Sequence, residues 1–441
     1  MALINIAQGT PCAGADGSVH NPYRARPDNA TDFDDIFRLR RGANTFLVQP
    51  GIYLTQGCYA YPQNGWAMID PNSSLIGVGG SEATSIVLAA NYISINPQSG
   101  QPIKQVETII GGGSAASGSE RMQVSGFRID VNNSLLPVLG LHTFSSGSNV
   151  FDVIVVGLIG DRTKPLPTDV AWEGFGILVN DSPSSRGGGS SIANCRAYMR
   201  TGSPKTYVTG IYLGSVAVQK NPNVIRDCYC EAPIPTTTLP PNDAQFHAAF
   251  AANQNTLIQN CTSNGFIRFF YADTGDVGDI EITGCRGDVG QYVVDAIAPY
   301  DAAANPIAYR RRIRLTNSTF TIDHPVTTYA VIFHAQEKNT EPAYNQVVIE
   351  DIDIHDLRVR SSLPAGNPAL QDGIGVYTVG LQGKKVDRVF VRNCTLPVGT
   401  KTTAGVYDTD YVPPATSGTP LPAGRVVFEN LKFTPVVVTA P

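Results

Sequence analysis

Acidic residues at the ends of two long turns are the first candidates for catalysis in this sequence. Asp169, Trp172 and Glu173 end one such turn, and Asp243 and His247 end a second. Glu173 and His247 precede equivalent strands two repeats apart, so we expect their backbones to lie ~9–10 Å apart by strand spacing. Side chains can close that gap to the separation of paired carboxylates in a glycosidase. The set predicts a glycosidase with Glu173 or Asp169 as general acid and Asp243 as its partner, and with Trp172 stacking on a sugar. Solvated or turn-capping acids are the alternative.

Residues in a shorter turn between these two complete a predicted sugar-binding groove. Lys205 and Tyr207 lie in that turn, and Arg268 is a further substrate-binding candidate, together with Trp172. In a uronate lyase, Lys205, Tyr207 or His247 would abstract the proton α to the carboxylate, with Ca²⁺ as a helping cation. Glycosidic hydrolysis or transfer would need no cofactor. The acids in the cluster favour neutral-sugar chemistry over a lyase.

Later strands supply other candidates. The phrase QDGIGV places Asp372 where it resembles the Asp-Gly-Ile strand entry of polygalacturonase-type glycosidases, which makes Asp372 a catalytic candidate. Asp295 and His334 are expected to point outward from strands of the same kind. The segment DTGDVGD at 273–279 lacks the ligand spacing of a calcium loop and is interpreted as a plain turn.

A repeated phrase must position these residues. SIANCRA, NVIRDCYC, TLIQNCTS and DIEITGCRG place cysteines at 195, 228, 261 and 285, in steps of 33, 33 and 24 residues. A second apolar phrase, GILV or GIYL, lies between the copies. Short alternating β-branched phrases predict strands, and a period of this length predicts stacked units. We therefore predict an all-β, single-domain, right-handed parallel β-helix (a solenoid).

The cysteine slot is expected to form a ladder of stacked inward side chains, because free cysteine behaves as a small buried hydrophobe. Neither zinc spacing nor a CxxC pair is present. Asn, Asp or Gly precedes the slot and predicts a polar ladder at a bend. The predicted slot residues are Phe127, Val153, Cys195, Cys228, Cys261, Cys285, Ser318, Ile352, Cys394 and Leu431. The predicted bend residues include Asp152, Asn194, Asp227, Asn260, Asn317, Asp351, Asn393 and Asn430.

Composition and charge exclude several classes. The 441 residues carry a net charge of −5, 16% charged side chains, 43 Gly and 31 Pro, which is typical of a turn-rich β protein. Nucleic-acid binding is not indicated, and no apolar run is long enough to predict a membrane helix. The start, MALINIAQGTPC, does not have the form of a signal peptide. The localisation therefore stays open between a secreted protein whose signal was removed and a phage or cytosolic protein.

The N-terminal part predicts a cap. Residues 1–30 are polar and are expected to be irregular, and NATDFDDIFRLRR then predicts a short helix capped by Thr31 or Asp32, with Phe33 and Leu39 on its apolar side. This helix and the following PGIYL resemble the N-terminal cap and first coil of the pectate-lyase-like β-helix superfamily. We predict an extension and capping helix at 1–45, the β-helix at 46–436 and a tail at 437–441.

The resemblance implies a carbohydrate-active enzyme, because that superfamily consists mainly of such enzymes. We therefore expect a glycoside hydrolase or transglycosidase acting on a polysaccharide or oligosaccharide in an external groove. The alternatives are a uronate polysaccharide lyase and a phage tailspike-like glycan-binding or depolymerase protein. A homotrimer is a further expectation, with Leu178, Tyr212 and Ile332 as apolar outward residues.

Overall fold

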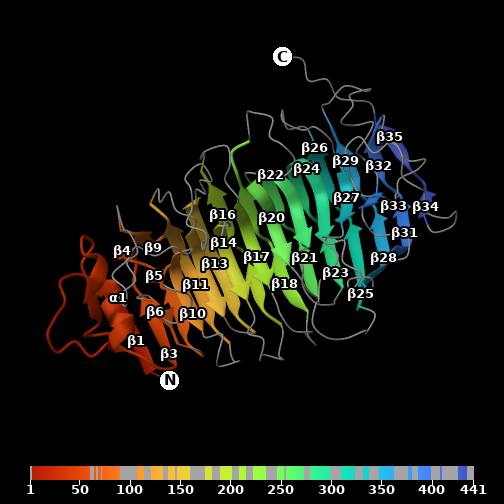
Figure 1. Ribbon diagram of the computed structural model, residues 1–441. Helices are drawn as coiled ribbons and strands as arrows, with labels where there is room; N and C mark the ends of the chain where they lie inside the picture. The colour runs from red at the N-terminus through yellow and green to blue at the C-terminus, as the bar shows by residue number, and fades with distance from the viewer. Residues whose placement is uncertain are drawn as a thin grey trace, which may run out of the picture. The chain divides into compact units, whose positions relative to one another are not determined.

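A computed structural model describes most of the strands and the N-terminal helix of the chain (Figure 1). The described residues are 2–59, 64–65, 68–70, 72–89, 107–113, 121–132, 138–144, 147–158, 174–180, 189–200, 208–214, 222–234, 246–252, 255–272, 279–297, 309–322, 331–336, 347–361, 376–379, 386–398, 408–409 and 426–434. The chain divides into two compact units, Met1–Ala232 and Pro233–Pro441, here called the N-terminal and the C-terminal unit. Each is described by itself.

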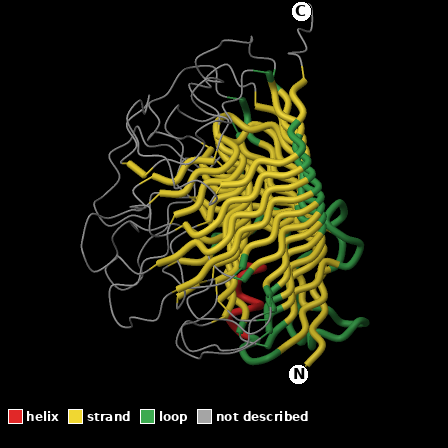
Figure 2. Tube along the Cα trace, turned by 90° about the vertical axis from the view of Figure 1, so that its right-hand side faces the viewer, coloured by secondary structure: helices red, strands yellow, loops and turns green. Residues whose placement is uncertain are grey.

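Both units are built from coils whose strands fall into three rows. Row A precedes a tight bend, row B follows it, and row C carries the GIxL-type phrases. Neighbouring strands within a row pair in parallel, as the stacked strands of Figure 2 show. The predicted all-β parallel β-helix is therefore confirmed.

The strands of the N-terminal unit are given row by row. Row A contains β1 (Ala2–Gln8), β3 (Asn44–Val48), β8 (Ser74–Gly77), the first halves of β11 (Gln123–Asp130) and β13 (Asn149–Leu158), β15 (Ser191–Ala193) and β18 (Asn223–Arg226). Row B contains β4 (Gly51–Thr55), β9 (Thr84–Leu88), the second halves of β11 and β13, β16 (Arg196–Met199) and β19 (Tyr229–Glu231). Row C contains β10 (Glu107–Gly113), β12 (Val138–Phe144), β14 (Gly174–Asn180) and β17 (Val208–Gly214). The short strands β2 (Tyr23–Ala25), β5 (Cys58–Tyr59), β6 (Asn64–Gly65) and β7 (Met68–Ile69) pair at the margins.

The C-terminal unit repeats the same rows. Row A contains β21 (Thr256–Gln259), β23 (Ile280–Thr283), β25 (Tyr309–Thr316), β28 (Val347–His355), β31 (Val386–Arg392) and β34 (Val426–Glu429). Row B contains the first parts of β22 (Thr262–Ala272) and β24 (Arg286–Ile297), then β26 (Thr319–Ile322), β29 (Arg358–Arg360), β32 (Thr395–Pro397) and β35 (Lys432–Thr434). Row C contains β20 (Phe246–Ala252), the second parts of β22 and β24, β27 (Val331–Gln336), β30 (Val376–Val379) and β33 (Asp408–Thr409).

A single residue with positive φ makes the bend between rows A and B. Asn, Asp and Gly tolerate this left-handed conformation better than other residues do, which explains their recurrence before the slot. The bend residues have φ between 49° and 78°, and they are Gly126, Asp152, Asn194 and Asp227 in the N-terminal unit and Asn260, Gly284, Asn317, Asp356, Asn393 and Asn430 in the C-terminal unit. The side-chain amide of Asn430 donates to Asn393 Oδ1 at 3.1 Å, so neighbouring coils are joined through this polar ladder.

The residue after each bend points inward, as the cysteine ladder predicted. Cys195 and Cys228 are buried in the N-terminal unit, and Cys261, Cys285 and Cys394 are buried in the C-terminal unit. One coil differs from the prediction, because its bend is Asp356 (φ 53°) and its slot residue is the fully buried Leu357. The choice of Asp351 and Ile352 was wrong because β28 continues to His355, so the chain turns later than the sequence suggested.

The predicted capping helix is present as α1 (Ala30–Leu39), which lies against β4 at the N-terminal end of the coils (Figure 2). Asn29 is its N-cap and accepts from the backbone N–H of Thr31 at 2.9 Å, so the predicted caps were displaced by two or three residues. Phe33 is buried, but Leu39 is 70% exposed and does not join the apolar side. Residues 1–30 are not irregular throughout, because β1 pairs in parallel with β3.

Two coils of the C-terminal unit pass from row B to row C without a connecting loop. Strand β22 pairs with β24 along its whole length, and β24 pairs first with β26 in row B and then with β27 in row C. In the next coil, residues 323–330 separate β26 from β27, and residues 361–375 separate β29 from β30. Neither of these two coils therefore has a loop of its own between rows B and C.

Candidate active site

Four polar or aromatic side chains meet on row C of the two loopless coils. Arg268 and Tyr271 lie on β22, and Tyr292 and Asp295 lie on β24. The register pairs Arg268 with Tyr292 and Tyr271 with Asp295. Arg268 Nε donates to Asp295 Oδ2 at 2.5 Å, and the guanidinium carbon lies 4.9 Å from the Tyr292 ring centre and 5.9 Å from that of Tyr271. These four residues are called the row C cluster below.

The Arg268 guanidinium reaches the Tyr271 ring although the two residues are three positions apart on β22. The pairing of β22 with β24 shifts in register just before Arg268, between Phe266 and Arg268. The two residues that follow Arg268, Phe269 and Phe270, are fully buried. Phe269 packs edge-on against Phe320 of row B, with ring centres 4.8 Å apart. The inward phenylalanines thus anchor the strand to the core, and the flanking Arg268 and Tyr271 are left on the outer side.

The ion pair at the centre of this cluster is almost withdrawn from water. The Asp295 side chain is 1% exposed and that of Arg268 is 12% exposed. Two charges taken out of water must be paired and hydrogen-bonded, and removing one partner of such a pair typically costs ~3–5 kcal/mol. A hydrophobic pair would often be as stable, so a buried ion pair on the outer face of a solenoid indicates a functional site.

The backbone register extends the same position to two further coils. His334 of β27 pairs with Asp295, and Tyr377 of β30 pairs with His334. Successive strands lie ~4.8 Å apart. An aspartate, a histidine and two tyrosines therefore occupy one line across four strands of row C.

Row C of the N-terminal unit carries a different set. His142 pairs with Leu178 and Leu178 with Tyr212, and the Tyr212 ring stacks on Phe175 at 5.4 Å. Burial lowers the pKa of His142 to about 3, so this imidazole is neutral at physiological pH. Leu178 is 4% exposed and therefore does not offer the apolar outer surface that was expected for a trimer.

Most sequence-predicted site residues lie outside the described part of the chain. These are Asp169, Trp172, Glu173, Lys205, Tyr207, Asp243 and Asp372. For His247 the structure describes the backbone, within β20, and Arg268 and Asp295 are the candidates whose side chains it places. The predicted roles of all these residues stay predictions.

Sequence reasoning missed Tyr271 and Tyr292, and it did not connect Asp295 with Arg268. The sequence feature that could have indicated these residues was the step of 24 residues between Cys261 and Cys285, because the two steps before it are each 33 residues long. The short step belongs to the coil of β22, which carries Arg268 and Tyr271. The coil of β24, which carries Tyr292 and Asp295, has an ordinary step of 33 residues from Cys285 to Ser318, so the sequence spacing indicates only half of the cluster.

Among the described residues, no group of three or more His, Cys, Asp and Glu side chains could hold a metal ion. Within the same residues, no helix has the length and apolar character that crossing a membrane requires.

Comparisons with known proteins identify the fold. No family model and no curated protein sequence matches the chain. Among solved structures, the A-module of the Azotobacter vinelandii mannuronan C-5 epimerase AlgE6 is similar at 13% identity and TM-score 0.50, over 93% of this chain and 97% of that one. Pectate lyase Pel9A is similar at 11% identity and TM-score 0.42 (83% and 80% covered), and PfbA, a surface adhesin of Streptococcus pneumoniae, at 12% and 0.40 (92% and 89%).

The chain therefore has a right-handed parallel β-helix fold like that of the AlgE6 A-module, as the sequence predicted. At these identities the likeness concerns the fold alone, and function must be argued from the site.

Proposed function

We propose that the protein is a carbohydrate-active enzyme that cleaves or rearranges glycosidic bonds of a polysaccharide, with its reacting centre at the row C cluster. The buried Arg268–Asp295 pair on the outer face of the loopless coils is the observation that carries this proposal. Active sites often hold charged groups in buried surroundings, where desolvation would favour their neutral forms. A saccharide chain lying along row C would pass one strand per ~4.8 Å.

The described groups suit elimination on a uronate better than hydrolysis. Arg268 brings a guanidinium with several N–H donors, a suitable partner for a substrate carboxylate. Tyr271 and Tyr292 bring phenols, and His334 lies beside Asp295 in the register. A phenolate or imidazole base would take the proton α to the carboxylate, the electron pair would form the C4–C5 double bond, and the oxygen on C4 would leave with a proton.

Hydrolysis or transglycosylation by paired carboxylates is the other form of the proposal. It requires two acids flanking the bond at a fixed separation. The row C cluster supplies one, Asp295, whose Oδ2 is already bound to Arg268. The second would have to come from Glu173, Asp169, Asp243 or Asp372, with His247 assisting.

Product analysis on a panel of acidic and neutral polysaccharides tests the proposal. Elimination yields new reducing ends together with ultraviolet absorbance of unsaturated sugars, and hydrolysis yields reducing ends alone. We expect Tyr271→Phe, which removes only a hydroxyl, and Asp295→Asn to lower kcat at least tenfold, about 1.4 kcal/mol of activation energy.

Asp279→Asn is the matched control, because it removes an acid of an ion pair with Arg312 that is 48% exposed on both sides. It should leave turnover within twofold. Full activity in both Tyr271→Phe and Asp295→Asn, with folding verified by circular dichroism, would refute the assignment. Loss of activity in Glu173→Gln and Asp243→Asn alone would move the centre to those acids. Tight binding of a glycan without products would indicate the tailspike-like or adhesin-like alternative.

A further inference from the structure

An alternating line of side chains follows the bend in the C-terminal unit. The first residue of row B after each slot is, coil by coil, Thr262, Arg286, Thr319, Arg358, Thr395 and Lys432. A hydroxyl therefore alternates with a cation over six successive strands. Since strands lie ~4.8 Å apart, the cations recur every ~9–10 Å.

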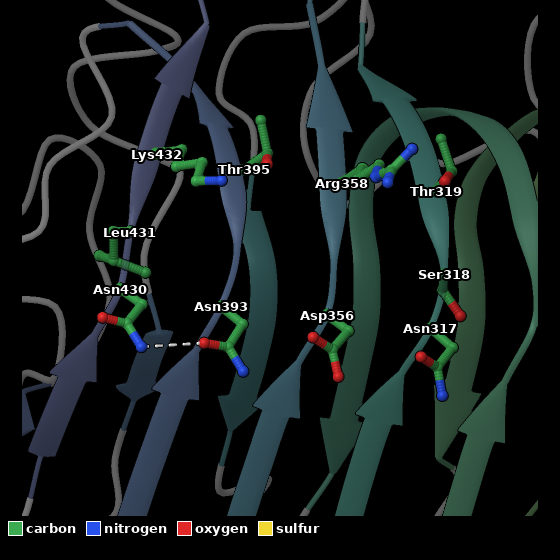
Figure 3. A pocket seen from close by; sticks show the side chains of 10 residues that line it. All are labelled: Asn317, Ser318, Thr319, Asp356, Arg358, Asn393, Thr395, Asn430, Leu431 and Lys432. Atoms are coloured by element: carbon green, nitrogen blue, oxygen red, sulfur yellow. Dashed lines mark hydrogen bonds between the residues drawn. The ribbon is translucent and has the colours of Figure 1, made fainter.

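The last four of these residues line a groove. Its volume is about 850 Å³, and its wall on the bend side consists of Asn317, Asp356, Asn393 and Asn430. Figure 3 shows the two lines of side chains in parallel, with Thr319, Arg358, Thr395 and Lys432 on one side and the bend residues on the other. Three of the bend residues are amides, and the fourth is Asp356, whose carboxylate pairs with His355 at 2.9 Å. The lining is polar along its length and crosses four coils, so it suits an elongated hydrophilic ligand rather than a compact apolar one.

Three arginines elsewhere in the unit form ion pairs within the described part of the protein, whereas the cations of this line do not. Arg312, Arg392 and Arg268 each pair with an aspartate. Among the residues that the structure describes, the exposed side chains of Arg286, Arg358 and Lys432 make no ion pair and no hydrogen bond. Alternation with threonine keeps like charges two strands apart, which lowers their mutual repulsion. The same spacing presents them to a periodic anion.

We propose that this groove binds an extended acidic glycan lengthwise, with a carboxylate on alternate sugars. One residue of an extended pyranose chain advances by about one strand spacing, so acids on every second sugar match cations on every second strand. The intervening threonine hydroxyls and the bend amides offer donors and acceptors to sugar hydroxyls at each rung. The site lies along the bend between rows A and B, whereas the row C cluster belongs to row C, and it does not depend on the proposed reaction.

Calorimetric titration with two hexasaccharides tests the spacing. Hyaluronan hexasaccharide carries a carboxylate on alternate sugars, and chitohexaose carries none. We expect the wild-type protein to bind the former at least tenfold more tightly at low salt, and the difference to shrink as salt screens the exposed charges. Arg358→Gln and Lys432→Gln should each weaken hyaluronan binding roughly two- to fivefold, which is the effect expected for loss of one exposed charge pair. The double variant should weaken binding by the product of the two single effects.

Arg314→Gln is the control, because Arg314 is an exposed arginine of β25 that lines a separate cavity of about 160 Å³. It should bind as the wild type does. Equal binding of both hexasaccharides, or unchanged hyaluronan binding in the double variant, would overturn the proposal. Loss of binding in Asp295→Asn but not in Arg358→Gln would also overturn it, by assigning the glycan to the row C cluster. Equal affinity for a single-stranded DNA hexamer would show a generic polyanion surface and would overturn the match of spacing.

Discussion

Asp34 of the capping helix should make the N-terminal cap less stable as pH rises. Its carboxylate is 2% exposed and accepts from Thr55 Oγ1 at 2.5 Å and from the Gln56 backbone N–H at 2.8 Å. Burial nevertheless raises its pKa from 3.8 to about 7, with a smaller contribution from the neighbouring charge of Asp35. The folded cap thus keeps a proton that the unfolded chain would already have lost.

The sign and size follow from linkage. Between about pH 4 and pH 7 the folded state binds more protons than the unfolded state, so the free energy of unfolding falls as pH rises through this range. The slope is ~1.4 kcal/mol per pH unit, and a shift of about three units gives a total of at most ~4 kcal/mol. Below about pH 4 and above about pH 7 the contribution of Asp34 should be flat.

Asp34→Asn isolates the pH-dependent contribution of Asp34 to the free energy of unfolding, because an asparagine can still accept a hydrogen bond from Gln56 and donate one to Thr55. We expect the variant to match the wild type near pH 4 and to exceed its stability by up to ~4 kcal/mol above pH 7. Hydrogen exchange of peptides covering α1 and β4 gives the opening free energy of the cap directly. Asp35→Asn is the matched control, since Asp35 is 42% exposed and pairs with Arg38 on the helix surface. A wild-type cap whose opening free energy does not change between pH 4 and pH 7, or an Asp34→Asn variant that keeps the slope, would refute the reasoning.

Two further perturbations test the ladders. Burial raises the pKa of the Cys195 thiol, so alkylation of the native protein near neutral pH should label exposed Cys12 and spare Cys195. Equal labelling of the two, measured by mass spectrometry, would contradict the buried ladder. Gly284→Ala should destabilise the C-terminal unit by ~1–3 kcal/mol in urea unfolding, because φ is +65° and the new Cβ would lie 2.6 Å from Asn260 Oδ1. Gly14→Ala, with positive φ but no atom within 4 Å, should cost less.

The fold could be predicted because each coil of a solenoid requires the same residue types at the same positions, which gives the sequence a regular period. A residue such as Asn194 or Asn393 before a cysteine is needed for the left-handed bend, and the cysteine after it must be small and apolar to stack inside. The prediction failed at Asp351 because the segment VVIEDIDIHDLRV offers three Asp-apolar steps. Only the length of β28 decides between them, and strand length depends on pairing with neighbours rather than on local pattern.

The candidate site was harder to predict because it depends on the absence of a loop. The groove was predicted between two long turns because long turns can form the walls of a binding site. Both turns lie in segments that the structure does not describe. The row C cluster lies where the chain has nothing between rows B and C. Contacts such as Arg268 with Asp295 join residues 27 positions apart, and the register that joins them includes a shift that no periodic pattern predicts.

The two proposed sites use the same physical property in different ways. In a packed solenoid the inner face is fixed by stacking, so binding groups must stand on outer positions, and their spacing is set by the strand distance. At the row C cluster, next to a register shift in β22, Arg268 pairs with the buried Asp295, which suits a single reacting centre. Along the bend the register runs without a shift through Thr319, Arg358 and Thr395, which suits a repeating ligand. We therefore associate an interruption of the strand register, as at the row C cluster, with a catalytic centre, and an uninterrupted repeat of surface side chains, as along the bend, with the binding of a polymer.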